Sequence, residues 1–236
     1  MKLKARGLSR SEIKYIAMLT MLCNHIAHIF LTEGTWSFLL MESIGYFTAI
    51  TMCYFLTEGY HYTHSKKRYA LRLFVFAVLS ELPYCLAFTK QGILSFRGLN
   101  MLFTLLLCFG MLVGMEQLHK PLARAVLLIA VVYASVICDW AVMAPLFTMI
   151  FAQTKEKKEL PRAYTMCIVI FLLFKLYIGQ QSVLEILVNC IGLILSGLCI
   201  IGLYHGKQSF GKTTGKWFFY AFYPVHLLIL GLLRLL

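Results

Sequence analysis

Charged residues are scarce in this sequence, and their scarcity limits the class of protein. Only 14% of the 236 residues are charged and 60% are hydrophobic, whereas a soluble domain of this size carries roughly 25% charged residues. The apolar residues form long blocks between short polar or basic stretches, and a membrane-spanning helix needs about 20 mostly apolar residues. The short alternating strands of a transmembrane barrel are missing. The sequence therefore predicts an all-α, polytopic bundle of transmembrane helices.

Cysteine motifs and low-complexity segments are also missing. The eight cysteines lie in or at the edge of apolar segments and none forms CxxC, so neither a zinc ribbon nor a disulfide framework is predicted. No internal repeat or soluble domain interrupts the pattern, which predicts a single integral-membrane domain over residues 1–236. The N-terminal stretch MKLKARGLSRSEIK resembles the start of a signal peptide, but no small-residue cleavage site follows, so we expect a retained first helix.

Nine candidate spans can be drawn, and we expect eight or nine transmembrane helices. They cover about residues 13–32, 37–57, 68–89, 99–117, 121–138, 140–153, 163–179, 183–204 and 217–236. The fifth and sixth are short and have Asp139 between them, so one of the two is a candidate re-entrant segment.

The basic residues predict how the chain is oriented. The formal net charge is +12, but the Lys and Arg residues cluster in short segments between apolar blocks. With the N-terminus in the cytoplasm, 18 of the 22 Lys and Arg residues fall on the cytoplasmic side and 4 outside. We therefore expect a cytoplasmic N-terminus in a bacterial cytoplasmic membrane, contacts with membrane lipids, and no nucleic-acid partner.

Polar residues inside the apolar blocks are functional candidates, because each is costly in hydrocarbon. In TMLCNHIAHIF, residues 20–30, His28 lies three positions after His25 and four after Asn24, so all three lie on or near one helix face. The topology places five polar residues in the middle and outer half of the bundle: His25, Glu81, Asn100, Asp139 and His226. It places a second group at the cytoplasmic entrance: Glu58, His61, His64, Arg68 and Arg72. We interpret His28, Glu42 and Thr104 as packing or hydrogen-bonding residues.

This distribution fits acyl transfer within a membrane. A histidine at depth can act as a general base on an amine or hydroxyl, and a basic cytoplasmic mouth suits the phosphates of a coenzyme A thioester. A rival interpretation is a small transporter or channel in which His25, Glu81 and His226 form a proton or substrate relay. A metal site at His25/His28 or His61/His64 lacks a nearby Cys or second His pair, so no metal is expected.

Several motifs together resemble the TraX family over nearly the whole chain. They are IAMLTMLCNHIAHIF, IGYFTAITMCYFLTEGYHYT, KKRYALRLFVFAVLSELPY, LNMLFTLLL and YAFYPVHLLIL, in the family's order and with similar spacing. The family is named for an inner-membrane protein that N-acetylates conjugative pilin, and it is related to the multi-spanning acyltransferases. The resemblance implies acetyl-CoA as the donor. It also implies that the following residues occupy motif positions of the family: His25, Glu58, Gly59, Thr63, Arg72, Glu81, Pro83, Asn100, Thr104, Tyr223, Pro224 and His226.

The chain departs from the family at two places. The family commonly has Asp-His where this chain has Asn24-His25, and Gly-Arg followed by Pro where this chain has Gly45-Tyr46 and Ile50. An Asn can orient an imidazole but cannot stabilise an imidazolium as a carboxylate would. Glu81 or Asp139 are candidates for that part, and we interpret the chain as a divergent branch with its own substrate.

These observations assign a role to each candidate. His25 is the general base or a transient acyl carrier, His226 supports it, and Asn24, Asn100 and Glu81 orient base and substrate. The substrate-binding candidates are Glu58, Thr63, Asp139 and Tyr223. The candidates for holding the coenzyme A phosphates are His64, Lys66, Lys67, Arg68 and Arg72. The acceptor stays open among a protein N-terminus, a peptide, a sugar and a lipid.

Overall fold

The computed structural model describes residues 7–236 except 91, 93, 180 and 207–213, and its regular elements are all helices. Nine are α-helices: α1 (Arg10–Phe30), α2 (Trp36–Tyr62), α3 (Lys66–Phe88), α4 (Met101–Gln117), α5 (Pro121–Ala134), α6 (Met143–Gln153), α7 (Leu160–Tyr177), α8 (Val183–Leu198) and α9 (Thr214–Leu235). Two short 3₁₀ segments, η1 (Ser135–Ile137) and η2 (Lys157–Glu159), precede α6 and α7, and a π-helical turn, η3 (Cys199–Leu203), extends α8.

Local sequence explains where several helices begin. Ser9 caps α1 and forms a capping box with Glu12, and Ser182 does the same for α8 with Glu185. Thr35, Ser65 and Asn100 cap α2, α3 and α4 with their side-chain oxygens. The first turns of α5 and α7 contain proline, whose missing N–H costs nothing there.

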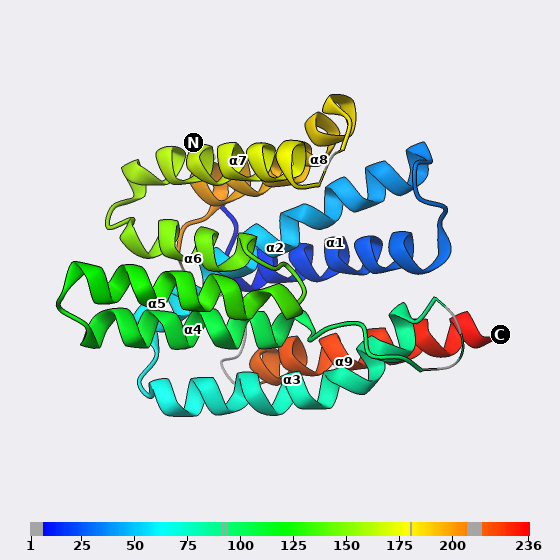
Figure 1. The fold of residues 1–236 in the computed structure, drawn as a ribbon, viewed down its shortest axis with the longest axis horizontal. Coiled ribbons are helices and arrows are strands. Elements are labelled where there is room, and N and C mark those ends of the chain that lie inside the picture. Colours follow the sequence, from blue (N-terminus) through cyan, green and yellow to red (C-terminus); the bar gives the residue numbers. More distant parts are fainter. Residues whose placement is uncertain (1–6, 91, 93, 180, 207–213) are drawn as a thin grey trace, which may run out of the picture.

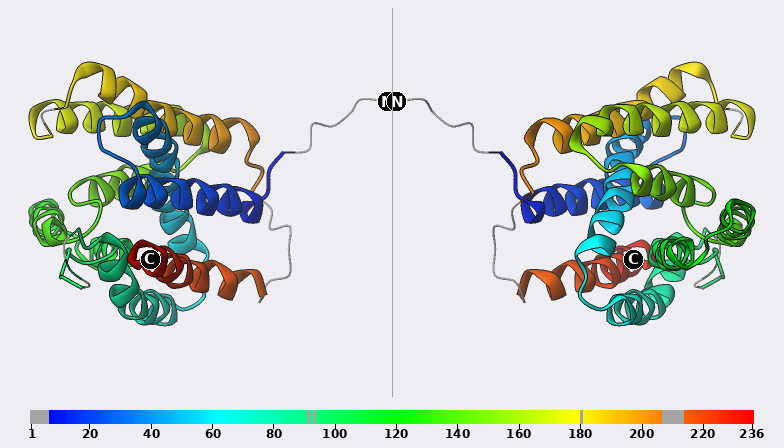
Figure 2. Two further views of the ribbon diagram at one scale, coloured as in Figure 1. Left: turned by 90° about the vertical axis from the view of Figure 1, so that its right-hand side faces the viewer. Right: turned by 90° about the vertical axis from the view of Figure 1, so that its left-hand side faces the viewer.

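Most helices run along the long axis of the molecule, and α2 passes obliquely through the middle (Figure 1). The end-on views show α1 beside α2 in the centre, with α7 and α8 on one side and α3 and α9 on the other (Figure 2). Sixteen of the 27 residues of α2 are buried, which fits its central position. It packs closely against α8, where a Cβ on Gly192 would lie 1.9 Å from the Ser43 carbonyl oxygen.

The predicted helical class is confirmed, and each predicted span overlaps one observed helix. Six helices are long and apolar enough to cross a membrane, and α4, α5 and α6 are shorter. The number of spans and the orientation stay predictions. Five of the basic residues counted for orientation lie outside the described residues: Lys2, Lys4, Arg6, Lys207 and Lys212.

Several boundaries differ from the prediction by a few residues, and two of these differences have a clear physical reason. α2 continues to Tyr62, five residues beyond the expected end, and stops where the chain becomes extended at Thr63. The helix expected from residue 140 begins at Met143 instead, because Trp140 and Val142 adopt positive φ angles of 59° and 65°. Large apolar side chains such as Leu122 on α5 and Leu82 on α3 are exposed, as expected for surfaces that face lipid.

Candidate active site

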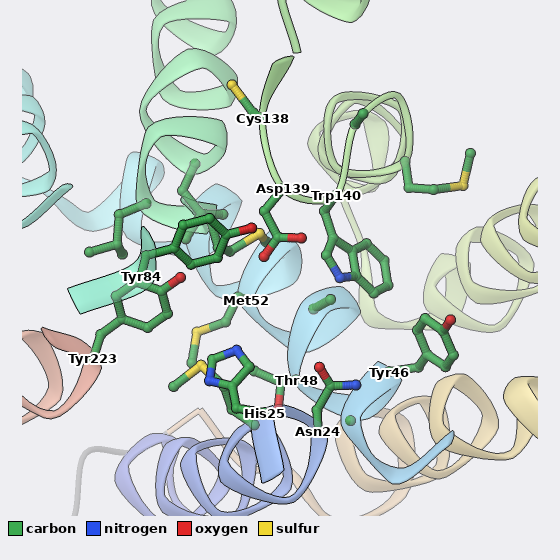
Figure 3. Close-up of a pocket in the computed structure, with 18 of the residues that line it drawn as sticks. Asn24, His25, Tyr46, Thr48, Met52, Tyr84, Cys138, Asp139, Trp140 and Tyr223 are labelled. Carbon is green, nitrogen blue, oxygen red and sulfur yellow. The ribbon is translucent and has the colours of Figure 1, made fainter. Parts of the chain in front are cut away.

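A cavity of about 1010 Å³ lies inside the bundle, with walls from α1, α2, α3, α4, α7, α9 and the turn before α6. One end lies beside Arg10 and Gly59, where α1 begins and α2 ends, and we call it the basic end. The other lies beside Glu33 and Lys90, just beyond α1 and α3, and we call it the far end. Figure 3 shows its middle part, with His25 facing it from α1. A cavity of this size accommodates a large ligand.

His25 has one well-defined hydrogen-bond partner. It is buried, with 6% of its surface exposed, and its Nδ1 lies 2.7 Å from Nε2 of His226 on α9. Nδ1 of His226 lies 2.7 Å from the carbonyl oxygen of Phe222, one turn earlier. A carbonyl only accepts hydrogen bonds, so in the neutral pair His226 Nδ1 carries the proton and its Nε2 accepts one from His25 Nδ1. His25 Nε2 is then unprotonated, and since His25 lines the cavity, the pair can serve as a base.

Asn24 lines the cavity next to His25, but its amide is directed to α2. Its Nδ2 lies 3.5 Å from the Glu42 carbonyl oxygen. A Cβ on Gly45 would lie 2.3 Å from the Asn24 Cβ, so only glycine leaves room for this side chain. The hydrogen bond that orients the His25 ring is made by His226.

Asp139 reaches the cavity from a strained turn between η1 and α6 (Figure 3). Its N–H donates to the Leu99 carbonyl (2.7 Å), and its own carbonyl accepts from Thr104 Oγ1 (2.5 Å). The positive φ angles of Trp140 and Val142 follow directly, and such conformations cost about 1–3 kcal/mol each. The surrounding bonds therefore hold the Asp139 backbone firmly, and Tyr84 and Tyr223 are electrostatic neighbours of its carboxylate.

Glu81 and Asn100 lie together, but neither is part of the cavity wall. The Glu81 carboxylate accepts from Asn100 Nδ2 (2.7 Å) and from the Asn100 N–H (3.2 Å). Asn100 Nδ2 also donates to the Ala77 carbonyl (2.8 Å), and its Oδ1 accepts from the Leu102 N–H (3.0 Å). These bonds anchor the first turn of α4 to α3.

Three cations line the basic end of the cavity: Arg10, Lys14 and Arg72. Arg10 is paired with Glu58 at 2.9 Å, and both also bond to the Tyr204 hydroxyl. Burial raises the pKa of Tyr204, so its hydroxyl stays a donor to Glu58. Lys14 lies 5.3 and 5.7 Å from two phenylalanine ring centres, and Arg72 lies 5.6 Å from a tyrosine ring centre. This end of the cavity is suited to an anionic ligand.

The predicted basic cluster is divided by the structure. Arg72 lines the cavity, whereas Lys66 at the start of α3 bonds Glu116 and the Tyr60 hydroxyl. Thr63 ends α2, with its hydroxyl 3.4 Å from a backbone oxygen two residues on. The remaining members are exposed on the surface at this end of the bundle: His64, Lys67 and Arg68.

The cationic end includes two residues that were not predicted as binding residues. Arg10 and Lys14 precede the apolar part of α1 and were counted only as orientation signals. Six of the eight cavity-lining residues of α1 recur at helical spacing along one face: Arg10, Lys14, Met18, Met21, His25 and His28. Continuing the face of His25 back toward the N-terminus would have found both cations.

Towards the far end, a partly buried chain of polar groups joins three helices. Glu42 lies 3.8 Å from His28 and accepts from the Tyr46 hydroxyl at 3.0 Å. Lys175 on α7 donates to the same hydroxyl at 2.8 Å. His28 and Glu42, interpreted from the sequence as packing residues, thus belong to the cavity wall.

The rim of the far end carries charges of both signs. Lys90 donates to Glu33 at 2.9 Å, and this hydrogen bond lowers the pKa of the exposed Glu33 carboxyl. Arg97 lines the same region. Unlike the basic end, the far end therefore has no single preferred charge for a ligand.

The fold and the cavity define a polytopic helical membrane protein with a buried histidine pair beside an internal cavity. The chain belongs to the TraX family: the family model described as "TraX protein" matches residues 9–234. It is 28% identical over 234 residues to the "Probable fimbrial assembly protein FimC, serogroup H1" of Dichelobacter nodosus, with 94% of each chain covered. No solved structure matches the chain.

Proposed function

We propose that this protein is an integral-membrane acyltransferase that moves an acetyl group from acetyl-CoA to an amine or hydroxyl acceptor. One observation carries the proposal: the unprotonated Nε2 of His25 faces a cavity whose basic end holds three cations. We place the protein in a bacterial cytoplasmic membrane with its basic end in the cytoplasm, where acetyl-CoA is available. The charge distribution of the sequence supports this orientation.

The donor enters at the basic end with its phosphates beside Lys14 and Arg72. The charge of Arg10 is already neutralised by Glu58, so Arg10 can contribute hydrogen-bond donors to the phosphates but little net positive charge. Lys14 and His25 are eleven residues apart on α1, about 16 Å along the axis at 1.5 Å per residue. This is comparable to an extended pantetheine arm, so a thioester whose phosphates bind Lys14 reaches His25.

His25 then acts as the general base. Its Nε2 takes the proton from the acceptor N–H or O–H while the acceptor's electron pair forms the new bond to the acetyl carbonyl carbon. The tetrahedral intermediate collapses by breaking the C–S bond, and the leaving sulfur takes the proton from His25. His226 holds the tautomer that makes this possible and, through the Phe222 carbonyl, supports the imidazolium between the two steps.

The acceptor enters from the far end. Charges of both signs line that end, so the acceptor's polar group can be an amine or a hydroxyl on a protein N-terminus, a peptide, a sugar or a lipid. The relative from Dichelobacter nodosus is described as a fimbrial assembly protein. We therefore place fimbrial subunits first among the acceptors to be assayed.

A transporter or channel is the second candidate, because the cavity lining extends from Arg10 at one end of the bundle to Lys90 at the other. A His25–Glu81–His226 relay receives no support, because Glu81 lies outside the cavity wall and bonds Asn100. Stabilisation of the purified protein by micromolar coenzyme A favours the enzyme, and indifference to coenzyme A favours transport.

Donor binding is tested with two arginines of the same helix. Arg72→Ala removes a cavity cation, whereas Arg68→Ala removes an exposed one a turn earlier. Loss of one charge-assisted contact costs about 1.5–3 kcal/mol, so Arg72→Ala should weaken coenzyme A binding roughly 10- to 100-fold in titration calorimetry. Arg68→Ala should leave it unchanged. Equal effects of the two variants would contradict the placement of the phosphates.

Transfer itself is tested with radiolabelled acetyl-CoA and a panel of acceptors. His25→Ala should abolish labelling of any acceptor that the wild type acetylates. His119→Ala, an exposed histidine after α4, is the matched control and should behave as wild type. Full transfer by His25→Ala would remove His25 from the chemistry.

A further inference from the structure

Acyl transfer at His25 needs a hydrogen-bond donor for the negative oxygen that develops on the substrate. Backbone N–H groups inside the described helices are already bonded within them, so side chains must supply most of the donors. Two hydroxyls in the wall are already in use: Thr48 Oγ1 donates to the Ala17 carbonyl (2.6 Å), and Tyr46 donates to Glu42 (3.0 Å). The hydroxyl of Tyr223 differs from both, because its proton has no acceptor among the described residues.

Tyr223 is placed beside the proposed base. It lies on α9, three residues before His226, and only 4% of its surface is exposed. Its ring meets those of His25 and His226 edge-on, with centroid separations of 6.2 and 5.7 Å. Figure 3 shows the hydroxyl directed into the cavity on the side opposite Asn24. A buried hydroxyl whose proton has no acceptor costs free energy, so the position calls for a ligand that accepts a hydrogen bond.

The start of α4 lies beside this hydroxyl. The Met101 amide approaches the Tyr223 oxygen, and Met101 is the first residue of α4, where the helix dipole is positive. The Glu81–Asn100 contact holds this helix end in place, which gives those two residues a positioning role behind the cavity wall.

We infer that Tyr223 donates its hydroxyl hydrogen bond to the carbonyl oxygen of the acetyl thioester as that oxygen becomes negative. The inference rests on the proposed acyl transfer. As the acceptor attacks the carbonyl carbon, the C=O electron pair moves to the oxygen and the Tyr223 O–H approaches it, without transferring its proton. When the C–S bond breaks the electron pair returns, and the leaving sulfur takes the proton held by His25. Tyr223 is thus a catalytic residue that binds the transition state more tightly than the substrate.

The experiment compares Tyr223→Phe with Tyr164→Phe in the full-length purified protein. Tyr164 is also a buried tyrosine, but its hydroxyl bonds Ser196 at 3.1 Å and lies outside the cavity wall. With acetyl-CoA and an acceptor that the wild type modifies, Tyr223→Phe should lower kcat about 100-fold, as loss of one oxyanion donor does. Its KM for acetyl-CoA should change less than threefold, and its Tm should stay the same or rise. Tyr164→Phe should keep kcat and lose Tm.

Three outcomes would overturn the inference: a wild-type kcat for Tyr223→Phe, a loss of Tm that accounts for lost activity, or a rise in KM alone. Fluorotyrosine at position 223, a stronger donor, provides the second test and should change kcat in step with phenol acidity. A rate indifferent to fluorination overturns the inference as well. Coenzyme A titration of the wild type separates the two proposals. If the wild type neither binds coenzyme A nor transfers acetyl, the acyltransferase function and the role of Tyr223 are both wrong. If it does bind and transfer, but Tyr223→Phe is as active as the wild type, only the role of Tyr223 is wrong.

Discussion

Substitutions of Glu81 can distinguish a catalytic role of this residue from a structural one, because the structure shows which hydrogen bonds each substitution removes. Asn100 has no exposed surface, so water cannot replace a lost partner. Glu81→Ala leaves the Asn100 N–H without its acceptor and removes one of the two acceptors of Asn100 Nδ2. A buried donor left unpaired costs about 1–3 kcal/mol, so the two donors together cost about 2–6 kcal/mol. The Ala77 and Leu102 bonds of Asn100 survive, which keeps the total towards the lower half of that range.

Glu81→Gln is the informative partner of that variant. Its amide oxygen can still accept from Asn100, so the stability loss should be about 1 kcal/mol, the usual worth of a neutral hydrogen bond. We expect Glu81→Ala to lower the Tm of the detergent-purified protein by several degrees and Glu81→Gln to lower it little and keep most of the acetyl transfer. A Glu81→Gln variant with wild-type Tm and no transfer would show that an acid is needed at this position and would refute the structural assignment.

Three further predictions concern single positions. His226→Phe should reduce transfer at least 100-fold without weakening coenzyme A binding, because His25 loses the acceptor that fixes its tautomer; intact transfer would mean that His25 works alone. Val142→Gly should raise stability by about 1 kcal/mol in chemical unfolding, because a β-branched residue at a φ of 65° is strained; a loss would show the strain is absent. Gly192→Ala should destabilise the protein by at least 1–3 kcal/mol, because its Cβ meets a backbone carbonyl of α2. Gly110→Ala, with open space at the same position of its Cβ, is the control and should be neutral or stabilising.

The helices were predictable from the sequence because each one carries its own signal. Apolar blocks and caps such as Ser9 are local, so helix existence follows from short stretches of chain. The turn at Asp139 was not predictable in detail, because the positive φ angles at Trp140 and Val142 persist only through bonds to distant segments. The extension of α2 to Tyr62 likewise escaped a hydropathy pattern, since its last turn is polar.

The candidate site was predictable as a set of residues but not as an arrangement. The topology placed His25, His226 and Asp139 at similar depth, and the structure brings them to one region together with Tyr223, a predicted substrate-binding residue. Depth cannot say which way a side chain points, so Glu81 was grouped with them although it lies behind the wall. Residue type also misled at the entrance, where exposed cations of α3 and cavity-lining cations of α1 look alike in sequence.

Because the cations and His25 lie on one face of α1, this helix sets a fixed distance between them. Its rise sets the distance between the cations that would bind a carrier and the base that would act on the carried group. One residue inserted between Lys14 and His25 would turn the two by about 100° relative to each other, whereas seven residues would restore the face and add about 10 Å. The number of residues between Lys14 and His25 therefore determines how long a carrier arm this protein can use.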